Sequence, residues 1–196
     1  MKQNKIYQIL LLSILVLLSG VAIYKLGYKP ESTLAGKRIL DGIQPYNYDQ
    51  DSGFIKRLFK ENWNWLIPDG QGFPLDAFLE LRPTRPGKPI STIKVLYEKN
   101  TPIGFTAYQK ENFYTGELRF ITIDTPYRGK GHSEKLMCHA LQDMRSWGLS
   151  RVELQTRLDN KPALALYEKL GFKELWRDAP YIRLERSLLD GPCINN

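Results

Sequence analysis

Residues 121–133 read ITIDTPYRGKGHS, and this stretch decides the fold. It joins an apolar strand to a helix through a glycine-rich loop. Gly129 and Gly131 allow the loop backbone to approach a ligand closely, because glycine carries no Cβ atom. The first N–H groups of the following helix have no partner within the helix, and they lie at the positive end of its dipole. The stretch therefore predicts a binding site for a phosphate or pyrophosphate group.

The glycine spacing excludes two common phosphate-binding loops. The P-loop pattern, GxxxxGK followed by Ser or Thr, is absent from the chain. Glu134 occupies the position of the third glycine in a GxGxxG dinucleotide loop. Glycine is common between a strand and a helix, so this loop alone is a weak signal.

A second motif makes the pattern specific. Residues 160–172 read NKPALALYEKLGF. Together with residues 128–133 this motif resembles the GNAT superfamily of N-acetyltransferases, whose acetyl-CoA loop has the form R/Q-x-x-G-x-G/A and whose later motif has the form N-x-x-A-x-x-L-Y-E-x-x-G-F. Ser133 departs from the loop pattern, but serine is small and keeps its N–H group, so pyrophosphate binding is expected to persist. The resemblance extends from about residue 37 to about residue 188.

The resemblance implies an α+β fold, with a mixed, mostly antiparallel central sheet and helices on both faces. The local patterns fit this plan. Apolar periodicity and terminal Gly and Pro signals predict helices at 51–62, 75–81, 133–147 and 160–170. β-branched and aromatic enrichment predicts strands at 37–44, 90–98, 103–110, 117–124, 151–156, 172–176 and 181–186.

The resemblance also implies which residues bind acetyl-CoA. Main-chain N–H groups of the loop would face the pyrophosphate, and main-chain groups of the preceding strand would pair with the pantetheine arm and the thioester carbonyl. Two side chains have alternatives: Arg128 would add charge or remain a solvated arginine, and Asn160 would bind the cofactor or cap its own helix. The side chain of His132 is expected to be non-catalytic. The expected cofactor-binding residues are Ile121, Ile123, Arg128, Gly129, Lys130, Gly131, His132, Ser133 and Asn160.

Two residues are candidates for proton transfer. An alkyl ammonium group has a pKa near 10 and must lose a proton before it can attack. Glu117 opens the strand before the loop, and the resemblance implies a general base there; the alternative is a solvated glutamate at a strand edge. Asp124 is a weaker candidate and is expected to be a turn residue. Tyr167 matches the family's tyrosine near the cofactor sulfur and is the expected general acid, or else packs on the sheet.

The acceptor is expected to be a primary amine of a small molecule or a protein, and its identity cannot be read from the chain. In this family the acceptor groove involves the first helices and the loops around them. This region supplies four aromatic and three basic residues, although such aromatics more often pack in a core. They are Trp63, Trp65, Phe73, Phe78, Lys56, Arg57 and Lys60. The alternative from another class is a catalytically inactive acyl-CoA-binding module tethered to a membrane.

The amino terminus carries an uncharged apolar run at residues 6–24. At about 1.5 Å per residue, this run would span roughly 28 Å as a helix, close to the hydrocarbon thickness of a bilayer. We expect a retained single-pass anchor within residues 1–29, then a linker at 30–36, the acetyltransferase domain at 37–188 and a tail at 189–196. A cleaved signal peptide is the alternative. More basic residues follow the run than precede it, which favours a cytoplasmic domain.

Charge and cysteine content exclude other classes. The formal net charge is +7, but four of the 28 basic residues and none of the 21 acidic residues lie in residues 1–29, so no nucleic-acid partner is expected. The two cysteines form no disulfide framework, and Cys138 is expected to be a small buried apolar side chain. No metal site is expected, because adjacent Cys138 and His139 lack the spacing of zinc ligands.

Overall fold

The computed structural model describes residues 39–190, except Lys88, together with Cys193. The expected membrane span at residues 6–24 and the linker at 30–36 lie outside the described residues. Among the helices that are described, none has the length and apolar character needed to cross a membrane.

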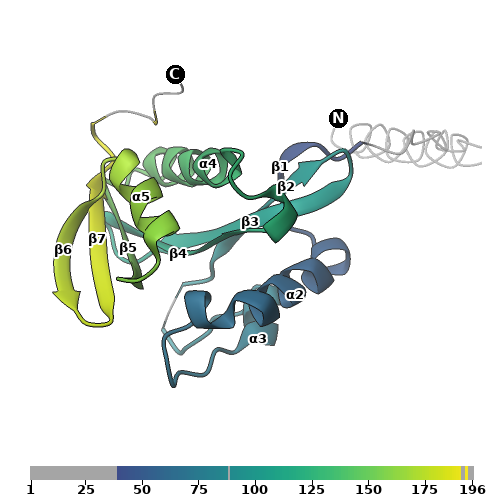
Figure 1. Cartoon of the computed structure of the whole chain (residues 1–196), viewed down its shortest axis with the longest axis horizontal. Coiled ribbons are helices and arrows are strands. Elements are labelled where there is room, and N and C mark those ends of the chain that lie inside the picture. The colour runs from purple at the N-terminus through teal and green to yellow at the C-terminus, as the bar shows by residue number, and fades with distance from the viewer. Residues whose placement is uncertain (1–38, 88, 191–192, 194–196) are drawn as a thin grey trace, which may run out of the picture. The chain divides into compact units, whose positions relative to one another are not determined.

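A seven-stranded sheet forms the centre of the domain (Figure 1), with strand order β1-β2-β3-β4-β5-β7-β6. Every neighbouring pair is antiparallel except β4 and β5, which are parallel. The predicted mixed, mostly antiparallel sheet is therefore confirmed. The strands are β1 Gly42–Pro45, β2 Thr92–Glu98, β3 Thr101–Lys110, β4 Thr115–Ile123, β5 Arg151–Arg157, β6 Lys173–Asp178 and β7 Tyr181–Ser187.

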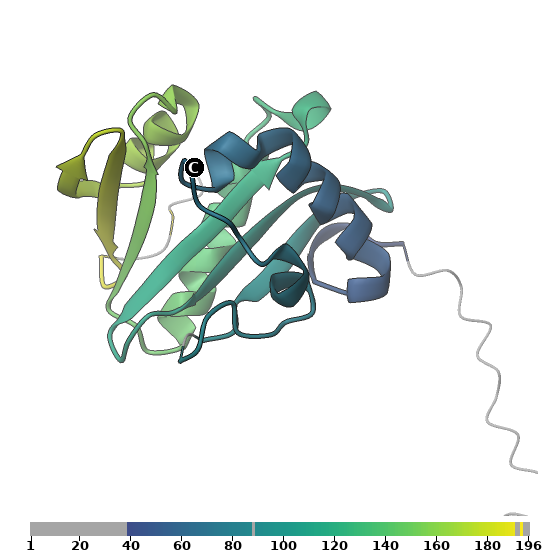
Figure 2. The ribbon, with the colours of Figure 1, turned by 90° about the horizontal axis from the view of Figure 1, so that it is seen from below.

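Helices cover both faces of the sheet, as predicted (Figures 1 and 2). Helices α2 (Tyr48–Leu66) and α3 (Leu75–Leu79) pack on one face through a core rich in phenylalanine. Helices α4 (His132–Ser146) and α5 (Lys161–Lys169) lie on the other face; α4 packs against β3 and β4, and both helices share a core with β5 and β7. A short 3-10 helix, η1 (Thr125–Tyr127), lies between β4 and α4.

Side-chain caps and left-handed glycines set the helix ends. Asn47 accepts a hydrogen bond from the N–H group of Gln50 at 3.1 Å and caps α2. Helix α4 ends before Gly148, whose φ of 79° is the left-handed conformation that glycine adopts most easily. Helix α2 runs further in both directions than the predicted 51–62. Exposed Trp63 and Trp65 break the apolar periodicity there, so the sequence pattern ends early.

A disulfide joins Cys193 to α4, which corrects one expectation. Cys138 is buried, as predicted, but it forms a disulfide with Cys193 instead of packing as a free thiol. The two Cα atoms lie 5.4 Å apart, within the usual range for a disulfide. The cysteines are separated by 55 residues, and no local sequence pattern brings them together.

The parallel pair of strands separates partway along its length, and this separation positions the site. Strands β4 and β5 pair from Thr115 with Arg151 to Leu118 with Leu154. Beyond that point β4 continues beside β3 alone. A bulge lies at the same place, because Tyr108 pairs with Leu118 while Ala107 pairs with Phe120. The residue between them on β4 is Arg119, and bulges of this kind redirect side chains.

Candidate active site

The far half of β4 presents main-chain groups on its open edge. The N–H group of Asp124 donates to the carbonyl of Ile103 at 2.9 Å, on the side of β3. Main-chain groups of successive residues in a strand point to opposite sides. The N–H and C=O groups of Ile121 and Ile123 therefore point to the side that β5 has left. This edge can pair with an extended ligand, as the sequence predicts for the pantetheine arm.

The loop after β4 has the conformation that an anion-binding turn requires. Gly129 and Gly131 have φ angles of 75° and 79°, so both occupy the left-handed region. The carbonyl of Gly131 already accepts the N–H group of Lys135 at 3.1 Å, which begins the ladder of α4. The N–H groups of residues 129–133 form no backbone hydrogen bond with any described residue. The loop therefore fits a pyrophosphate, and the Ser133 substitution leaves its main chain available.

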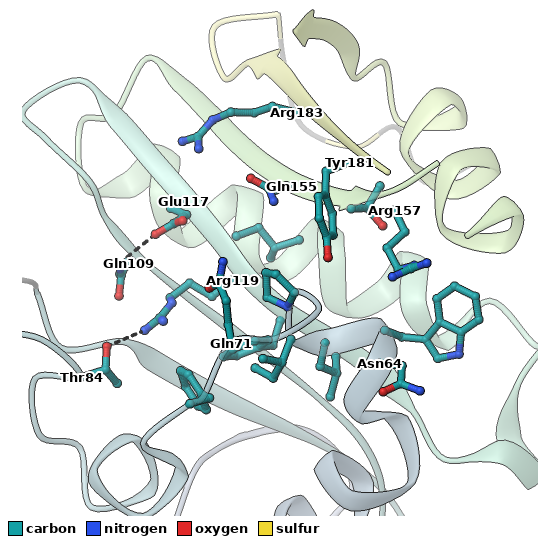
Figure 3. Close-up of a pocket in the computed structure, with 18 of the residues that line it drawn as sticks. Asn64, Gln71, Thr84, Gln109, Glu117, Arg119, Gln155, Arg157, Tyr181 and Arg183 are labelled. Carbon is teal, nitrogen blue, oxygen red and sulfur yellow. Dashed lines mark hydrogen bonds between the residues drawn. The ribbon is translucent and has the colours of Figure 1, made fainter. Parts of the chain in front are cut away.

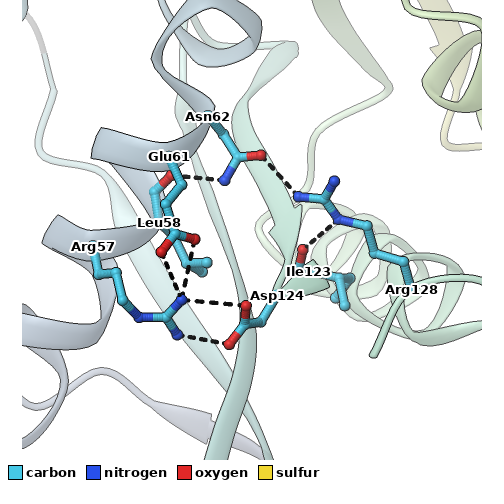
Figure 4. A network of polar contacts seen from close by, with 7 residues as sticks. All are labelled: Arg57, Leu58, Glu61, Asn62, Ile123, Asp124 and Arg128. Carbon is cyan, nitrogen blue, oxygen red and sulfur yellow. Dashed lines mark hydrogen bonds and ion pairs between the residues drawn. The ribbon is translucent and has the colours of Figure 1, made fainter. Parts of the chain in front are cut away.

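Arg128 fastens this loop to helix α2 (Figure 4). Its Nε donates to the carbonyl of Ile123 at 2.8 Å, and its Nη2 donates to Oδ1 of Asn62 at 2.8 Å. Asn62 lies at a kink in α2, where its own amide group donates to the carbonyl of Leu58. The guanidinium of Arg128 thus positions the end of β4. A solvated arginine without partners would not have this role.

Asp124 belongs to the same polar network and is a structural turn residue. Its carboxylate pairs with Arg57 at 2.6 Å, and Arg57 also bonds Glu61 (Figure 4). The hydrogen bond from Arg57 holds the pKa of Asp124 below its usual value. A carboxylate with a lowered pKa and a fixed partner is a poor general base. The expectation of a turn role fits this geometry.

A pocket of about 370 Å³ opens on the α2 and α3 side of the sheet, where β4 and β5 separate (Figure 3). Its volume falls within the roughly 300–1,000 Å³ of small-molecule sites. The strands contribute residues that directly follow the last paired positions, and the loops around α2 and α3 form the opposite wall. The lining includes Glu117, Arg119, Gln155, Arg157, Tyr181 and Thr84.

Glu117 lies in this pocket, held by buried polar neighbours. Its Oε2 accepts from Nε2 of Gln109 at 2.9 Å, and Oε1 of Gln109 accepts from the hydroxyl of Ser91 at 2.8 Å. Both Gln109 and Ser91 are buried, so their hydrogen bonds fix the orientation of the Glu117 carboxylate. Oε1 of Glu117 receives no hydrogen bond from the described residues. One oxygen is thus held and the other is available to an acceptor amine.

Tyr167 lies on the opposite face of the sheet from Glu117. It is buried in the core formed with α4 and packs against Phe172, with 5.7 Å between ring centroids. Burial raises the pKa of its hydroxyl, which keeps the phenol protonated at neutral pH. The ring therefore packs on the sheet, which is one of the two expectations, and the role of the hydroxyl as general acid stays a prediction.

Three other predicted residues lie around the loop. The side chain of Asn160 accepts from the N–H group of Ala163, so it caps α5. His132 is the first residue of α4, and its Nε2 is buried without a hydrogen-bond partner among the described residues. The ammonium group of Lys130 lies 5.5 Å from the centre of the Tyr127 ring. Lys130 is therefore an exposed loop residue with one aromatic contact.

The expected acceptor residues divide between the pocket and other places. Trp65 and Phe73 line the pocket, whereas Phe78 is buried in the core. Lys56 forms an ion pair with Asp76, and Arg57 forms one with Asp124. Both cations therefore form ion pairs at the surface of α2. Beyond Glu117, sequence reasoning missed the charged residues that the strands supply, which are Arg119, Arg157 and Arg183. Arg119 was the available signal, because a charge inside an apolar strand requires a structural reason.

Comparison with known proteins gives the class. The model of the Acetyltransferase (GNAT) family matches residues 55–172. The chain therefore belongs to the acetyltransferase (GNAT) family. Membership confirms the predicted enzyme class, an N-acetyltransferase, and acetyl-CoA as the donor that this class uses.

Individual relatives are more distant. The chain is 33% identical over 82 residues to mycothiol acetyltransferase of Corynebacterium glutamicum, covering 42% of this chain and 28% of the relative. It is 36% identical over 76 residues to N-alpha-acetyltransferase 30 of Schizosaccharomyces pombe, covering 39% and 47%. The chain thus spans less than half the length of these curated relatives.

A solved structure shares the fold. PaiA N-acetyltransferase from Thermoplasma acidophilum, determined in complex with coenzyme A, superposes with a TM-score of 0.62 at 17% identity. The superposition covers 74% of this chain and 97% of that protein. At this identity the likeness establishes the fold alone.

Proposed function

We propose that the chain transfers an acetyl group from acetyl-CoA directly to a primary amine of a small molecule or a protein. The observation that carries this proposal is the separation of β4 from β5. Beyond that point the edge of β4 is open and leads toward the loop at 129–133, and the pocket lined by Glu117 opens beside the separation. A donor held along the edge would place its reactive end beside an acceptor in the pocket.

Residues on the two faces of the sheet divide the proton transfers between them. Acetyl-CoA supplies an activated thioester when it is bound. Oε1 of Glu117 takes a proton from the acceptor ammonium, which frees the nitrogen lone pair for attack. As the C–N bond forms and the C–S bond breaks, the hydroxyl of Tyr167 gives its proton to the departing sulfur. The second proton of the attacking nitrogen then passes through water to the Tyr167 oxygen, and Glu117 releases its proton to solvent, so both residues return to their starting states.

Main-chain groups supply the remaining stabilisation. An N–H group on the open edge of β4, from Ile121 or Ile123, would donate to the thioester carbonyl oxygen as negative charge develops there. Loss of one such donor typically costs about 3–4 kcal/mol in the transition state. Arg128 fixes this edge through its hydrogen bond to the carbonyl of Ile123.

We also propose that residues 6–24 anchor the chain in a membrane, with the acetyltransferase domain in the cytoplasm. The length of the apolar run and the basic residues that follow it support the anchor, and the supply of acetyl-CoA supports the side. Disulfides persist mainly in oxidising compartments, so the bond between Cys138 and Cys193 weighs against this side, and a reducing cytoplasm would keep both as thiols. Alkylation of intact cells followed by mass spectrometry should find both thiols free. An intact disulfide would place the domain on the other side.

The test of the proposed activity is a thiol-release screen. The full chain, in mild detergent, is incubated with acetyl-CoA and panels of polyamines, amino acids, aminoglycosides and peptides. We expect release of free coenzyme A that depends on one class of amine, with an acetylated product of matching mass. Release of thiol with no acetylated amine, or no release with any panel, would contradict the proposal.

A further inference from the structure

Two arginines that line the acceptor pocket, Arg85 and Arg119, form no ion pair with a described residue, and of these two Arg119 comes from the sheet. Three arginines from β4, β5 and β7 line it, and two of them are paired. Arg157 binds Asp69 and Asp159, and Arg183 binds Glu153 at 2.8 Å. Arg119 forms no ion pair within the described part of the chain. Its environment therefore differs from that of the other two.

Aromatic rings hold the Arg119 side chain in place. Its Cζ lies 5.4 Å from the ring centre of Phe73 and 5.4 Å from that of Phe120. Stacking against aromatic rings fixes the plane of a guanidinium while leaving its N–H edge available. Because Arg119 lies at the bulge in β4, it has no partner residue on β3. The fold thus presents this side chain to the pocket and restricts its motion.

The hydrogen bonds of Arg119 are few and long. Nη1 donates to the hydroxyl of Thr84 at 3.3 Å, as Figure 3 shows, and to the hydroxyl of Ser91 at 3.4 Å. Nε and Nη2 have no acceptor among the described residues. These two nitrogens form the edge of a guanidinium that binds a carboxylate through two parallel hydrogen bonds. The unused edge has the geometry of a carboxylate site.

The guanidinium of Arg119 is partly removed from solvent, so an acceptor for its two unbonded nitrogens would be favourable. Burial lowers the pKa of Arg119, the negative charges of Glu117 and Glu111 oppose this shift, and the positive charge of Arg85 adds to it. An arginine keeps its charge in a protein despite such a shift. The Glu117 carboxylate forms no ion pair with Arg119, so a bound anionic group would further offset the cost of burying this cation.

We propose that Arg119 is a specificity-determining residue that binds a carboxylate of the acceptor, so the acceptor is an amine that also carries an acidic group. The inference rests on the proposed function, because it places the amine at Glu117. Glu117 and Arg119 are two positions apart on β4 and both line the pocket. Such positions lie roughly 6–7 Å apart along a strand. The amine and the carboxylate are therefore separated by several bonds.

The test uses amines of graded length. The full chain is assayed with linear aminoalkanoic acids from glycine to 6-aminohexanoate, each compared with its carboxamide. A second arm compares peptides that carry Glu at the second or third position with the same peptides carrying Gln. The first arm reports a free amino acid and the second an acidic peptide, so the two sources of the carboxylate are distinguished.

The expected result is a preference for the carboxylate in one arm, lost in Arg119→Gln. We expect the variant to lower kcat/KM for the preferred carboxylate about 10-fold to 100-fold, and to leave its carboxamide unchanged. Arg119→Lys should restore only part of the preference, because lysine cannot form the paired hydrogen bonds. Arg145→Gln, at the exposed end of α4, is the matched control and should change neither rate.

The outcomes separate this inference from the proposed function. Equal rates for carboxylates and carboxamides would overturn the carboxylate site while leaving acetyl transfer intact. A preference that survives in Arg119→Gln would also overturn it. If no amine is acetylated, the proposed activity fails, and titration of Trp65 fluorescence with the same pairs then decides the binding claim. Tighter binding of carboxylates that depends on Arg119 supports the site. Equal binding of each carboxylate and its carboxamide overturns it.

Discussion

The two halves of this site are built from different parts of the polypeptide. The proposed donor half consists of main-chain groups, on the open edge of β4 and in the loop at 129–133. The acceptor half, on the other face of the sheet, consists of side chains that come from β3, β4, β5, β7 and the loops around α2 and α3. A main-chain site depends on a backbone conformation that few sequences satisfy. A side-chain site can change residue by residue while the fold stays the same.

This difference explains what each half can reveal. The glycine loop has a characteristic sequence pattern, so the donor half can be recognised from a single sequence. The acceptor half leaves none, because its residues are scattered from Asn64 to Arg183 and gather only in the folded chain. The donor half therefore gives the class of reaction, whereas the acceptor half must give the substrate. Variants of single residues can test this division.

The largest effect is expected from Glu117→Gln. Removal of a general base should lower kcat/KM about 10³-fold at neutral pH, within the usual range for general acid–base catalysis. The loss should shrink as pH rises toward the pKa of the amine, because more acceptor then arrives already deprotonated. A pH profile of acetylation checks this. Glu98→Gln, at the exposed end of β2, is the matched control, and a uniform loss at every pH would exclude the role of base.

A smaller loss is expected from Tyr167→Phe. The variant keeps the buried ring and removes the proton donor, so kcat should fall about 10²-fold while the affinity for acetyl-CoA stays unchanged. Stopped-flow turnover and calorimetric titration measure the two quantities separately. Tyr114→Phe, in the exposed loop before β4, should alter neither. If the wild-type chain binds acetyl-CoA without any turnover, the inactive binding module is the better description.

Gly131→Ala probes the main-chain half. A residue with a Cβ is disfavoured at a φ of 79° by about 1–2 kcal/mol, so the loop should shift and the affinity for acetyl-CoA should fall about 5-fold to 30-fold. Gly148→Ala is a matched control, because Gly148 has the same φ and equally open surroundings but ends α4. It should lower stability without changing the dissociation constant. Equal effects of both variants on binding would contradict a local role for the loop.

The smallest effect on activity is expected at the disulfide. In oxidised protein, Cys193→Ser should lower the free energy of unfolding by about 2–4 kcal/mol and leave kcat/KM unchanged. The reason is that the bond restrains the unfolded chain, whereas neither cysteine lines the pocket or belongs to the loop at 129–133. Denaturant unfolding with and without a reducing agent measures this, and the reducing agent should have no further effect on the variant. A variant as stable as the oxidised wild type would show that the tail is not tethered.

Much of the fold was predictable, because local signals agree with the tertiary structure. Gly148 and Gly171 mark the ends of α4 and α5, and both adopt the left-handed conformation. The loop glycines and Tyr167 also lie where the motifs place them. Contacts between distant segments were not predictable. The ion pair of Arg57 with Asp124 and the disulfide of Cys138 with Cys193 depend on chain segments that only the sheet brings together.

Arg119 shows the same limit within the site. Its sequence context is an apolar strand, and only the bulge at Leu118 and the separation of β5 explain why a charge can lie there. Gln109 is similar, because its role in orienting Glu117 follows from the pairing of β3 with β4. Register errors of one residue would place either side chain on the wrong face.

The most direct test of the central claim is a crystal structure of the chain with bound coenzyme A. We predict that the pyrophosphate accepts hydrogen bonds from main-chain N–H groups of residues 129–133. The pantetheine arm should lie along the edge of β4 at Ile121 and Ile123, with its sulfur near Tyr167 and facing the pocket of Glu117. A cofactor bound elsewhere, or side chains that fill the space between β4 and β5 in the complex, would contradict the account.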